Sequence, residues 1–319
     1  MSLRTPSSHN ACLTFVGHIS IDTVENMHGT RTQPGGGALY AAIAAKTLNV
    51  PTALVSAIGR DFTYHDCFQG LDASGIRTLN MPTTRFHIQY NKNWDDTYLK
   101  ASSGAGARIT PSQIPARLLT PHSIIHIAPL KPAKALKILN SIRRRSPETK
   151  ISISTWIGYT NQPRNRKLLA KLAAQVDFFM LNEFEAKALT QTSSISLALE
   201  RIKTDRLVIT MGKLGAIISG TNIEPQMMPA TLLPARKTVD TTGAGDTWNG
   251  AFLAAYAATQ DLMKAVTVAS VISSLKCQQW GFKALQKLTF ENPGDVVAYV
   301  LALKEGGMQK KITQFATKP

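Results

Sequence analysis

The stretch "TVDTTGAGDTWNGAF", residues 238–252, places a Gly-Ala-Gly turn between two aspartates and directly ahead of a helical pattern. Beyond the turn, Trp248, Ala251, Phe252 and Ala255 recur at helical spacing and so share one face. A helix that starts after glycines presents unpaired N–H groups and the positive end of its dipole to whatever lies ahead of it. The stretch therefore predicts an anion-binding helix start with a carboxylate beside it.

The turn and the aspartate after it suit phosphoryl transfer. The amides of Gly243, Ala244 and Gly245 can surround an anion, because glycine lets the backbone approach it closely. Asp246 can take a proton from an attacking hydroxyl while these amides hold the phosphoryl group. Asp246 is also an ordinary first-turn residue and the glycines suit any tight turn, so the interpretation depends on the other elements of the chain.

Composition indicates a folded intracellular protein. The chain has 319 residues, 44% of them hydrophobic, which is enough for a large core. Its three cysteines are widely spaced and form no CxxC motif, which fits a reducing cytosol. No apolar run approaches the ~20 residues of a membrane span, and the first ten residues lack the order of a secretory signal. We expect a soluble cytoplasmic protein without a membrane partner.

The net charge of +16 is typical of proteins that bind phosphates, including nucleic acids. The basic residues are dispersed, however, and only Arg143–Arg145 and Lys310–Lys311 form short clusters, without interleaved aromatics. Solvated faces account for such clusters, so we expect no nucleic-acid partner. The surplus charge can still attract a polyanionic small substrate.

Short β-rich runs alternate with longer helical patterns along the chain. Strands are expected at residues 12–17, 52–59, 123–130, 150–155, 178–182 and 206–212. Helices are expected at residues 38–49, 133–145, 166–176, about 247–279 and 293–304. This alternation predicts βαβ units and a mostly parallel sheet with helices on both faces. No repeat or linker divides the chain, so we expect a single α/β domain over residues 1–319.

One region departs from the alternation. Residues 83–90 and 96–103 read as two strands around a polar, turn-prone segment, which predicts a hairpin. In the first strand Phe86, Ile88 and Tyr90 point one way and the intervening polar residues the other. The hairpin is either a lid over a site or an ordinary edge hairpin, and periodicity does not separate the two.

Residues with useful chemistry follow several of the expected strands. In open α/β sheets, ligands bind outside the carboxyl ends of the strands. The residues at those ends, or opening the next helix, are Asp22, Gly35, Gly36, Gly37, Asn182, Glu185, Thr210, Gly212 and Gly215. Together with residues 238–252, they predict one site at this edge of the sheet.

The order of these elements along the chain resembles that of the ribokinase-like, or PfkB, carbohydrate kinases over about residues 12–304. The segment "DTTGAGD" is close to the most specific signature of that family. The resemblance implies an ATP-dependent kinase with Asp246 as the catalytic base and residues 243–245 as the anion hole. It also implies a ribokinase-like domain whose β-lid, about residues 22–34 and 84–104, closes over substrate and excludes water.

The resemblance assigns roles to the remaining residues. Asn182 and Glu185 match an N-x-x-E element that handles the phosphates and a water-bridged Mg²⁺. The nucleotide site is lined by Thr210, Gly212 and Gly215. Acceptor hydroxyls are gripped by Asp22, in a pocket that begins at Gly35, Gly36 and Gly37. The implied cofactors are ATP and Mg²⁺, with room for a monovalent cation, and the chain is expected to act as a monomer or homodimer.

Two departures from the family pattern lie on the acceptor side. Tyr40 stands where many members carry an asparagine, and Ser154, Thr155 and Trp156 replace an Asp-x-Asn pattern. Tyr40 either borders the acceptor pocket, which favours a ring-shaped acceptor, or turns into the core of an apolar helix. The acceptor is thus expected to be a small sugar, cyclitol or nucleoside.

Two other protein classes compete with a kinase. A dinucleotide-binding oxidoreductase needs G-x-G-x-x-G directly after a strand, and the spacing at residues 35–40 breaks that pattern. A non-catalytic protein could keep the same fold for nucleotide binding or scaffolding. Asp246, Asn182 and Glu185 argue against this second class, and measured ATP consumption separates it from a kinase.

Overall fold

The protein, described here from a computed structural model, is resolved over residues 12–230 and 238–304 and contains a nine-stranded central sheet. The strand order is β13-β12-β11-β10-β9-β8-β1-β4-β5. The strands are β1 (Leu13–Val16), β4 (Thr52–Gly59), β5 (Asp72–Leu79), β8 (Ile124–Ile127), β9 (Lys150–Ser154), β10 (Phe178–Asn182), β11 (Arg206–Thr210), β12 (Gly215–Gly220) and β13 (Ile223–Pro229). Neighbours pair in parallel except at β12 and β13, which form an antiparallel edge.

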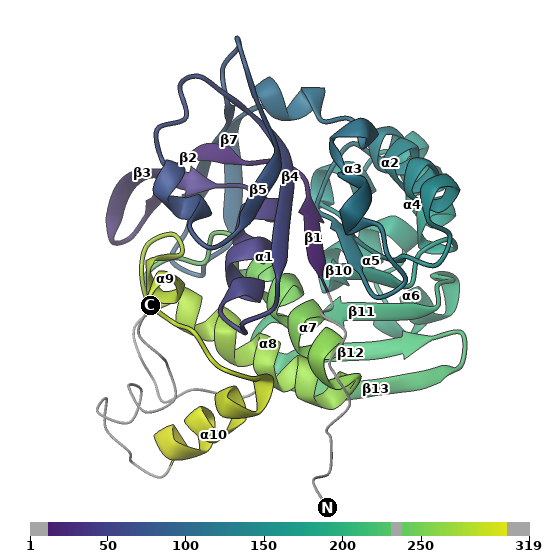
Figure 1. Cartoon of the computed structure of the whole chain (residues 1–319). Helices are drawn as coiled ribbons and strands as arrows, with labels where there is room; N and C mark the ends of the chain where they lie inside the picture. The colour runs from purple at the N-terminus through teal and green to yellow at the C-terminus, as the bar shows by residue number, and fades with distance from the viewer. Residues whose placement is uncertain (1–11, 231–237, 305–319) are drawn as a thin grey trace, which may run out of the picture.

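Helices cover both faces of this sheet (Figure 1). They are α1 (Gly37–Lys46), α2 (Pro132–Arg145), α3 (Ile157–Thr160), α4 (Pro163–Ala173), α5 (Glu183–Thr190), α6 (Ile195–Arg201), α7 (Ala244–Thr259), α8 (Leu262–Lys276), α9 (Lys283–Gln286) and α10 (Pro293–Lys304). Short 3-10 helices lie at His65–Phe68, Gly104–Arg108, Pro111–Gln113, Ala116–Leu118 and Gly212–Leu214. The expected single α/β domain with a mostly parallel sheet is confirmed.

The two faces of the sheet hold separate apolar cores. One core combines α1, α7 and α8 with inward residues of the strands, and the other combines α2, α4, α5 and α6 with the opposite residues. Every residue of β4 is buried, because a parallel strand between two helix layers has no solvated face. This double coverage explains why the strands read as continuous apolar runs in the sequence.

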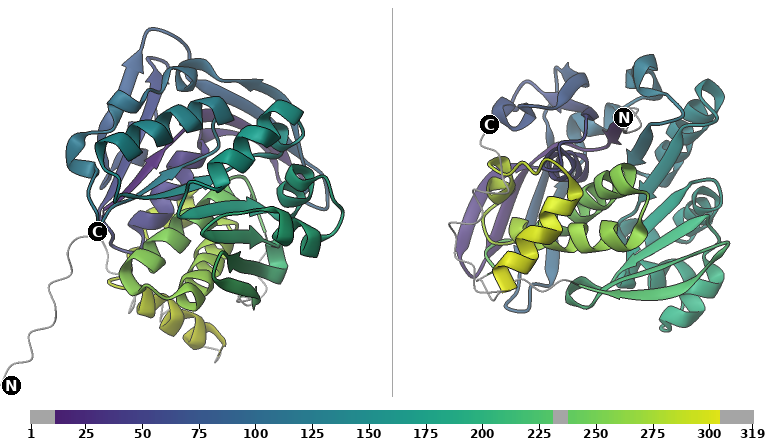
Figure 2. Two further views of the ribbon diagram at one scale, coloured as in Figure 1. Left: turned by 90° about the vertical axis from the view of Figure 1, so that its right-hand side faces the viewer. Right: turned by 60° about the horizontal axis from the view of Figure 1, so that its bottom comes forward.

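A second sheet of four strands stands apart from the central sheet, with the order β3-β2-β6-β7 (Figure 1). Its strands are β2 (Ser20–Asn26), β3 (Gly29–Gly35), β6 (Thr84–Tyr90) and β7 (Asp96–Ser102). The expected hairpin is present as β6 and β7, and β6 pairs in parallel with β2. In Figure 2 (right), the green helices α7 and α8 lie between the purple strands of this small sheet and the edge strands β11 to β13. We call this sheet the β-lid after the role that the family resemblance implies for it, and its closure over a site stays a prediction.

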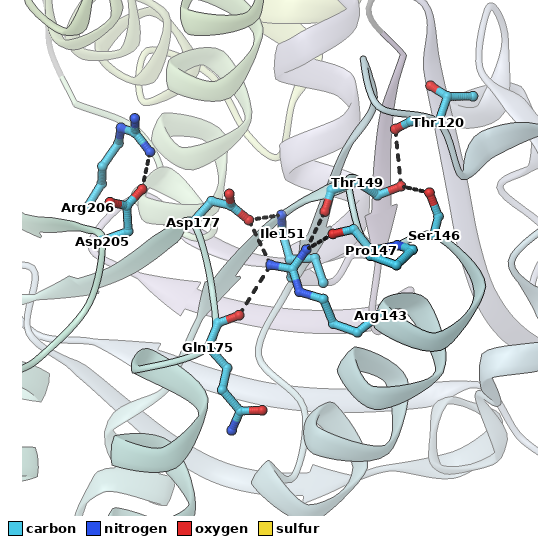
Figure 3. Close-up of polar contacts among 10 residues, drawn as sticks. All are labelled: Thr120, Arg143, Ser146, Pro147, Thr149, Ile151, Gln175, Asp177, Asp205 and Arg206. Carbon is cyan, nitrogen blue, oxygen red and sulfur yellow. Dashed lines mark hydrogen bonds and ion pairs between the residues drawn. The ribbon is translucent and has the colours of Figure 1, made fainter.

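Two arginines of the basic cluster Arg143–Arg145, at the end of α2, donate hydrogen bonds that connect neighbouring loops. The guanidinium of Arg143 donates to the carbonyl oxygens of Pro147, Thr149 and Gln175 and to the carboxylate of Asp177 (Figure 3). Arg145 donates to the carbonyl oxygen of Ile114 at 2.8 Å. The expectation of a solvated face is therefore corrected for these two arginines. Arg143 holds the loops at the amino ends of β9 and β10, and Arg145 holds the segment that precedes β8. Lys310–Lys311 and the first ten residues lie outside the described residues.

Within residues 12–230 and 238–304, no helix has the length and apolar character needed to cross a lipid bilayer. Cys12, Cys67 and Cys277 are all free thiols.

Candidate active site

Helix α7 starts at Ala244, inside the Gly-Ala-Gly stretch, and so begins slightly earlier than the sequence predicts. Gly243 adopts a left-handed conformation with φ of 70°, which glycine tolerates without strain, and no side chain caps the helix start. The Ala244 amide donates to the carbonyl oxygen of Thr241 at 3.0 Å. The amides of Gly243 and Gly245 make no hydrogen bond to the described residues, so these two amides are left to bind an anion.

Asp246 lies in the first turn of α7 and faces the start of α1. A methyl group at Gly37 would lie 2.8 Å from Oδ1 of Asp246, so a side chain at position 37 would press on the carboxylate. Burial raises the pKa of Asp246 from 3.8 to about 7. A carboxyl group with that pKa can accept and release a proton near neutral pH.

Asp22 lies in β2 of the β-lid, at the other end of the glycine segment. Its side chain is 2% exposed, and a methyl group at Gly35 would overlap Oδ2. Burial raises the pKa of Asp22 to about 7, and the nearby carboxylates of Asp240 and Asp246 raise it further. Among the described residues, Oδ1 of Asp22 has no hydrogen-bond partner. Such an acceptor-only oxygen suits the hydroxyl of a ligand.

An aromatic cluster joins the β-lid to the loop after β9. Tyr98 of β7 packs edge-on against Trp156 at 5.2 Å between ring centroids, and Trp156 packs in the same way against Tyr159 at 5.3 Å. In the described part of the chain, Nε1 of Trp156 and Oγ1 of Thr155 are buried without a partner. Trp156 therefore packs between Tyr98 and Tyr159 and carries an N–H group that no described residue pairs with.

The residues expected on the nucleotide side lie at the carboxyl ends of neighbouring strands. Asn182 of β10 and Thr210 of β11 are opposite one another in the parallel pairing. Oδ1 of Asn182 accepts from the Glu185 amide at 2.9 Å, and Oε2 of Glu185 accepts from the Asn182 amide at 3.0 Å. The N-x-x-E element is therefore a capping box that orders the start of α5.

Glu185 is 7% exposed and lies near enough to Asp246 for the two carboxyl groups to interact electrostatically. Burial raises the pKa of Glu185 to about 8, and the carboxylate of Asp246 contributes to this rise. Within the described residues, no three His, Cys, Asp or Glu side chains are grouped as a metal site. Such a group is not required for Mg²⁺, which is commonly bound through one or two carboxylates together with nucleotide phosphates and water.

The glycines of the T-x-G-x-x-G element shape the turn between β11 and β12. Gly215 has φ of 118°, and a methyl group there would overlap the carbonyl oxygen of Met228. Gly212 has φ of 55° and faces open space. The turn closes through the Met211 amide, which donates to the carbonyl oxygen of Gly215 at 2.8 Å.

Tyr40 does not line a pocket, although bordering the acceptor pocket was one of the two positions expected for it. It is 1% exposed, packs edge-on against Phe282, and lies so close beneath Gly243 that a methyl group at Gly243 would overlap its ring. Helix α1 is buried on nearly all sides, so its large aromatic residue turns inward. The structure therefore places Tyr40 in the core beneath the anion-binding turn, and its influence on acceptor choice stays a prediction.

His18 also has a structural environment. Its Nδ1 lies 3.1 Å from Oγ1 of Thr84, and burial lowers its pKa to about 4, so the ring is neutral at physiological pH.

Sequence reasoning missed a buried polar pair behind the turn. Asp240, the first aspartate of the signature, and Lys276, the last residue of α8, are both 0% exposed. The signal available in the sequence was a lysine at the end of the otherwise apolar pattern of residues 265–275.

The chain is similar to known proteins whose family can be identified. The model of the pfkB family carbohydrate kinases matches residues 11–287. The chain belongs to this family. It is 28% identical to a cytidine kinase of Thermococcus kodakarensis over 278 residues, which cover 84% of this chain and 97% of that protein. It is also 28% identical to a ribokinase of Bacillus subtilis over 290 residues, covering 85% and 94% of the two chains.

A solved member of the same fold is the fructokinase of Vibrio cholerae, with fructose, ADP and a calcium ion bound. It superposes with a TM-score of 0.73 at 20% identity, covering 91% of this chain and 99% of the fructokinase. Family membership makes this chain a phosphotransferase with a hydroxyl group as acceptor, within the sugar and nucleoside kinases.

Proposed function

We propose that the protein transfers the γ-phosphoryl group of ATP to a hydroxyl of a small sugar, cyclitol or nucleoside. The observation that carries this proposal is the glycine segment of residues 35–37, which separates two buried carboxyl groups. Asp22 borders Gly35 and Asp246 borders Gly37. Asp246 also stands at a helix start with free amides, so a proton acceptor and an anion site adjoin.

In this proposal Asp22 accepts hydrogen bonds from the acceptor through its unpaired oxygen and holds it over residues 35–37. Asp246 takes the proton of the attacking hydroxyl, whose oxygen forms the new bond to the γ-phosphorus. The bond between that phosphorus and the bridging oxygen breaks, and ADP leaves with the oxygen. The amides of Gly243 and Gly245, and of Ala244 if it leaves Thr241, hold the charge that develops during transfer.

The nucleotide then lies across the ends of β10 and β11, on Asn182, Thr210, Gly212 and Gly215. Glu185 is placed to orient water around a Mg²⁺ ion carried in with the phosphates. That ion, when bound, neutralises charge on the phosphate oxygens.

The similar proteins support a narrower choice of acceptor substrate. Names of similar proteins include a cytidine kinase and a ribokinase, and both ligands contain ribose. We therefore favour a ribose ring, free or within a nucleoside, as the group that Asp22 grips. The unpaired Nε1 of Trp156 and the ring of Tyr98 suit the additional flat ring of a nucleoside. Free thiols at all three cysteines suit a cytoplasmic enzyme.

The test is an acceptor screen read by ADP release. Cytidine, adenosine, inosine, ribose, fructose and myo-inositol are each offered with ATP and Mg²⁺, and release without acceptor is subtracted. We expect acceptor-dependent release that Asp246→Asn lowers by at least ~10²-fold. If the wild-type protein binds ATP but releases no ADP with any acceptor, the alternative of a non-catalytic nucleotide-binding or scaffolding protein is favoured.

The pH dependence follows from the two raised carboxyl pKa values. Transfer needs Asp246 deprotonated, and the pKa values of Asp246 and Asp22 are both about 7. The kcat/KM for the acceptor should therefore rise with pH through an apparent pKa near that value, which belongs to the interacting pair. A carboxyl with an ordinary pKa of 3.8 would give a flat profile from pH 5 to 8. A flat measured profile would contradict the assignment of the base.

Glu185→Gln should raise the Mg²⁺ concentration needed for half-maximal rate by about tenfold or more, as loss of outer-shell groups does. The reason is that an amide orients metal-bound water less strongly than a carboxylate, and the positive charge of a bound metal ion favours the carboxylate form of Glu185. Glu183→Gln is the matched control, because Glu183 lies in the same first helical turn but is paired with Lys187. Equal Mg²⁺ curves for the two variants would remove Glu185 from the metal role.

A further inference from the structure

We propose that Lys276 is an internal cation that positions the anion-binding turn, residues 240–246, so that the enzyme needs no monovalent cation from solution. Lys276 does not touch substrate in this arrangement and acts as a positioning residue. The inference rests on the proposed function in one respect, because this turn is where we place the transferred phosphoryl group.

The ammonium group of Lys276 lies at the first residue of the turn. Its Nζ donates to the carbonyl oxygen of Asp240 at 2.8 Å and lies 3.6 Å from Oδ2 of the same residue. Both side chains are fully buried. Burial lowers the pKa of Lys276, while the carboxylate of Asp240 acts in the opposite direction. A lysine ammonium that pairs with a buried carboxylate and a carbonyl meets the requirements of a buried cation.

The carboxylate of Asp240 passes this restraint to the rest of the turn. Its Oδ1 accepts from the Thr242 amide at 2.8 Å, which bends the chain toward the glycines. Its Oδ2 accepts from the Gly281 amide at 2.8 Å and from Nε2 of Gln33 at 3.0 Å. The Asp240 carboxylate therefore links the turn to two distant segments and is itself neutralised by Lys276.

The same cation lies under the ring on which the turn rests. Nζ of Lys276 is 5.3 Å from the ring centroid of Tyr40, a cation–π distance. The same ring lies against Gly243, where a methyl group would overlap it. Tyr40 therefore contacts both the cation and the glycine turn, which gives its position beneath the turn a physical reason.

The β-lid is bonded to the chain that enters the turn. Gln33 of β3 reaches Asp240, Nδ2 of Asn26 donates to the carbonyl oxygen of Val239 at 3.0 Å, and His28 donates to that of Thr238 at 2.9 Å. An uncompensated Asp240 carboxylate would disturb both the turn and this attachment of the lid. Buried ion pairs contribute little net stability, so stability alone gives weak grounds for a lysine here.

The experiment compares Lys276→Ala with the wild-type protein in the presence of Mg²⁺, in buffers whose only monovalent cation is a bulky amine. Alanine leaves space for a small cation. We expect wild-type turnover to be unchanged by added K⁺ or NH₄⁺. Lys276→Ala should lose roughly 10²-fold in kcat, as when one anion-hole donor is removed, with KM for ATP little changed. Added NH₄⁺, K⁺ or ethylammonium should restore most of this loss.

The matched control is Lys264→Ala. Lys264 lies on the same helix at the same 3.6 Å separation from an aspartate, Asp261, but its side chain is 63% exposed. Its loss should leave turnover unchanged and confer no cation dependence. Cation dependence of the wild-type protein would overturn the proposal. So would a folded Lys276→Ala variant with normal turnover, or with reduced turnover that no cation restores.

A second readout does not depend on activity. Hydrogen exchange of the amides in residues 240–246 should be faster in Lys276→Ala and should slow again when NH₄⁺ is added. Absence of ADP release from the wild-type protein would refute the proposed function, while the exchange result would still decide the positioning role. Normal transfer by both proteins, with identical exchange, would refute only the role of Lys276.

If Lys276→Ala does not fold, the double variant Lys276→Met with Asp240→Asn removes both charges and keeps the volume. A folded double variant with low kcat and fast exchange in the turn supports the proposal. A folded double variant with full turnover overturns it. Failure of this variant to fold as well would assign the pair to folding and also overturn it.

Discussion

Asp246→Asn lowers kcat by at least ~10²-fold, the usual loss when a general base is removed, and leaves ATP affinity nearly unchanged. Asparagine keeps the shape of the side chain against Gly37 but cannot accept the proton. Steady-state ADP release gives kcat, and titration with ATP in the absence of acceptor gives the affinity. The residual activity should no longer vary with pH around 7, because the titrating carboxyl is gone.

An aspartate in the first turn of a helix can also stabilise that helix without taking part in catalysis. Asp295→Asn is the control that measures this stabilising effect alone. Asp295 occupies the first turn of α10 and bonds locally to Asn292. Its substitution should lower stability by about 0.5–1 kcal/mol, as loss of a helix-start carboxylate does, and leave kcat unchanged. If Asp246→Asn shows only a comparable loss of stability and near-normal turnover, Asp246 is not the base.

Tyr40→Asn costs about 3 kcal/mol or more of unfolding free energy, as truncation of large buried aromatics does, and leaves the ranking of acceptors unchanged. The cause is the position of the ring, which is 1% exposed and fills the space between Phe282, Lys276 and Gly243. Denaturant unfolding gives the first quantity, and relative kcat/KM values over the acceptor panel give the second. Ratios are needed because a disturbed turn lowers all rates together.

Tyr40→Phe is the control for this variant, since it keeps the ring and removes only a hydroxyl whose bond to Gln33 is long, at 3.5 Å. It should cost less than about 1 kcal/mol, the typical worth of one hydrogen bond. A changed acceptor ranking in Tyr40→Asn at wild-type stability would return Tyr40 to the acceptor pocket.

Much of the framework was predictable because its signals are local. Residues 52–59 and 178–182 were expected as strands and are β4 and β10 with the same bounds. Strands covered on both faces are apolar throughout, and helices repeat their apolar positions every three or four residues. Both patterns can therefore be recognised from a short stretch of sequence. The turn before α7 was legible for the same reason, because glycines and a first-turn aspartate act on their neighbours.

The pairings between distant segments were decided by the tertiary structure. The sequence predicted the hairpin of β6 and β7, but the parallel pairing of β6 with β2 joins segments about sixty residues apart. It did not indicate β5 or the antiparallel edge of β12 and β13. Strand periodicity specifies which side chains share a face, and it carries no information about which strand lies alongside.

The same distinction applies within the site. By itself the sequence determined which residues stand at the strand ends and at the helix start, since both are local properties of the chain. Only the tertiary structure decided that Asp22 and Asp246 flank one glycine segment, that Tyr40 lies under Gly243, and that Lys276 neutralises Asp240. Each of these contacts depends on how closely two helices, or a helix and a sheet, pack against one another. Burial then shifts the pKa values of the groups enclosed between them.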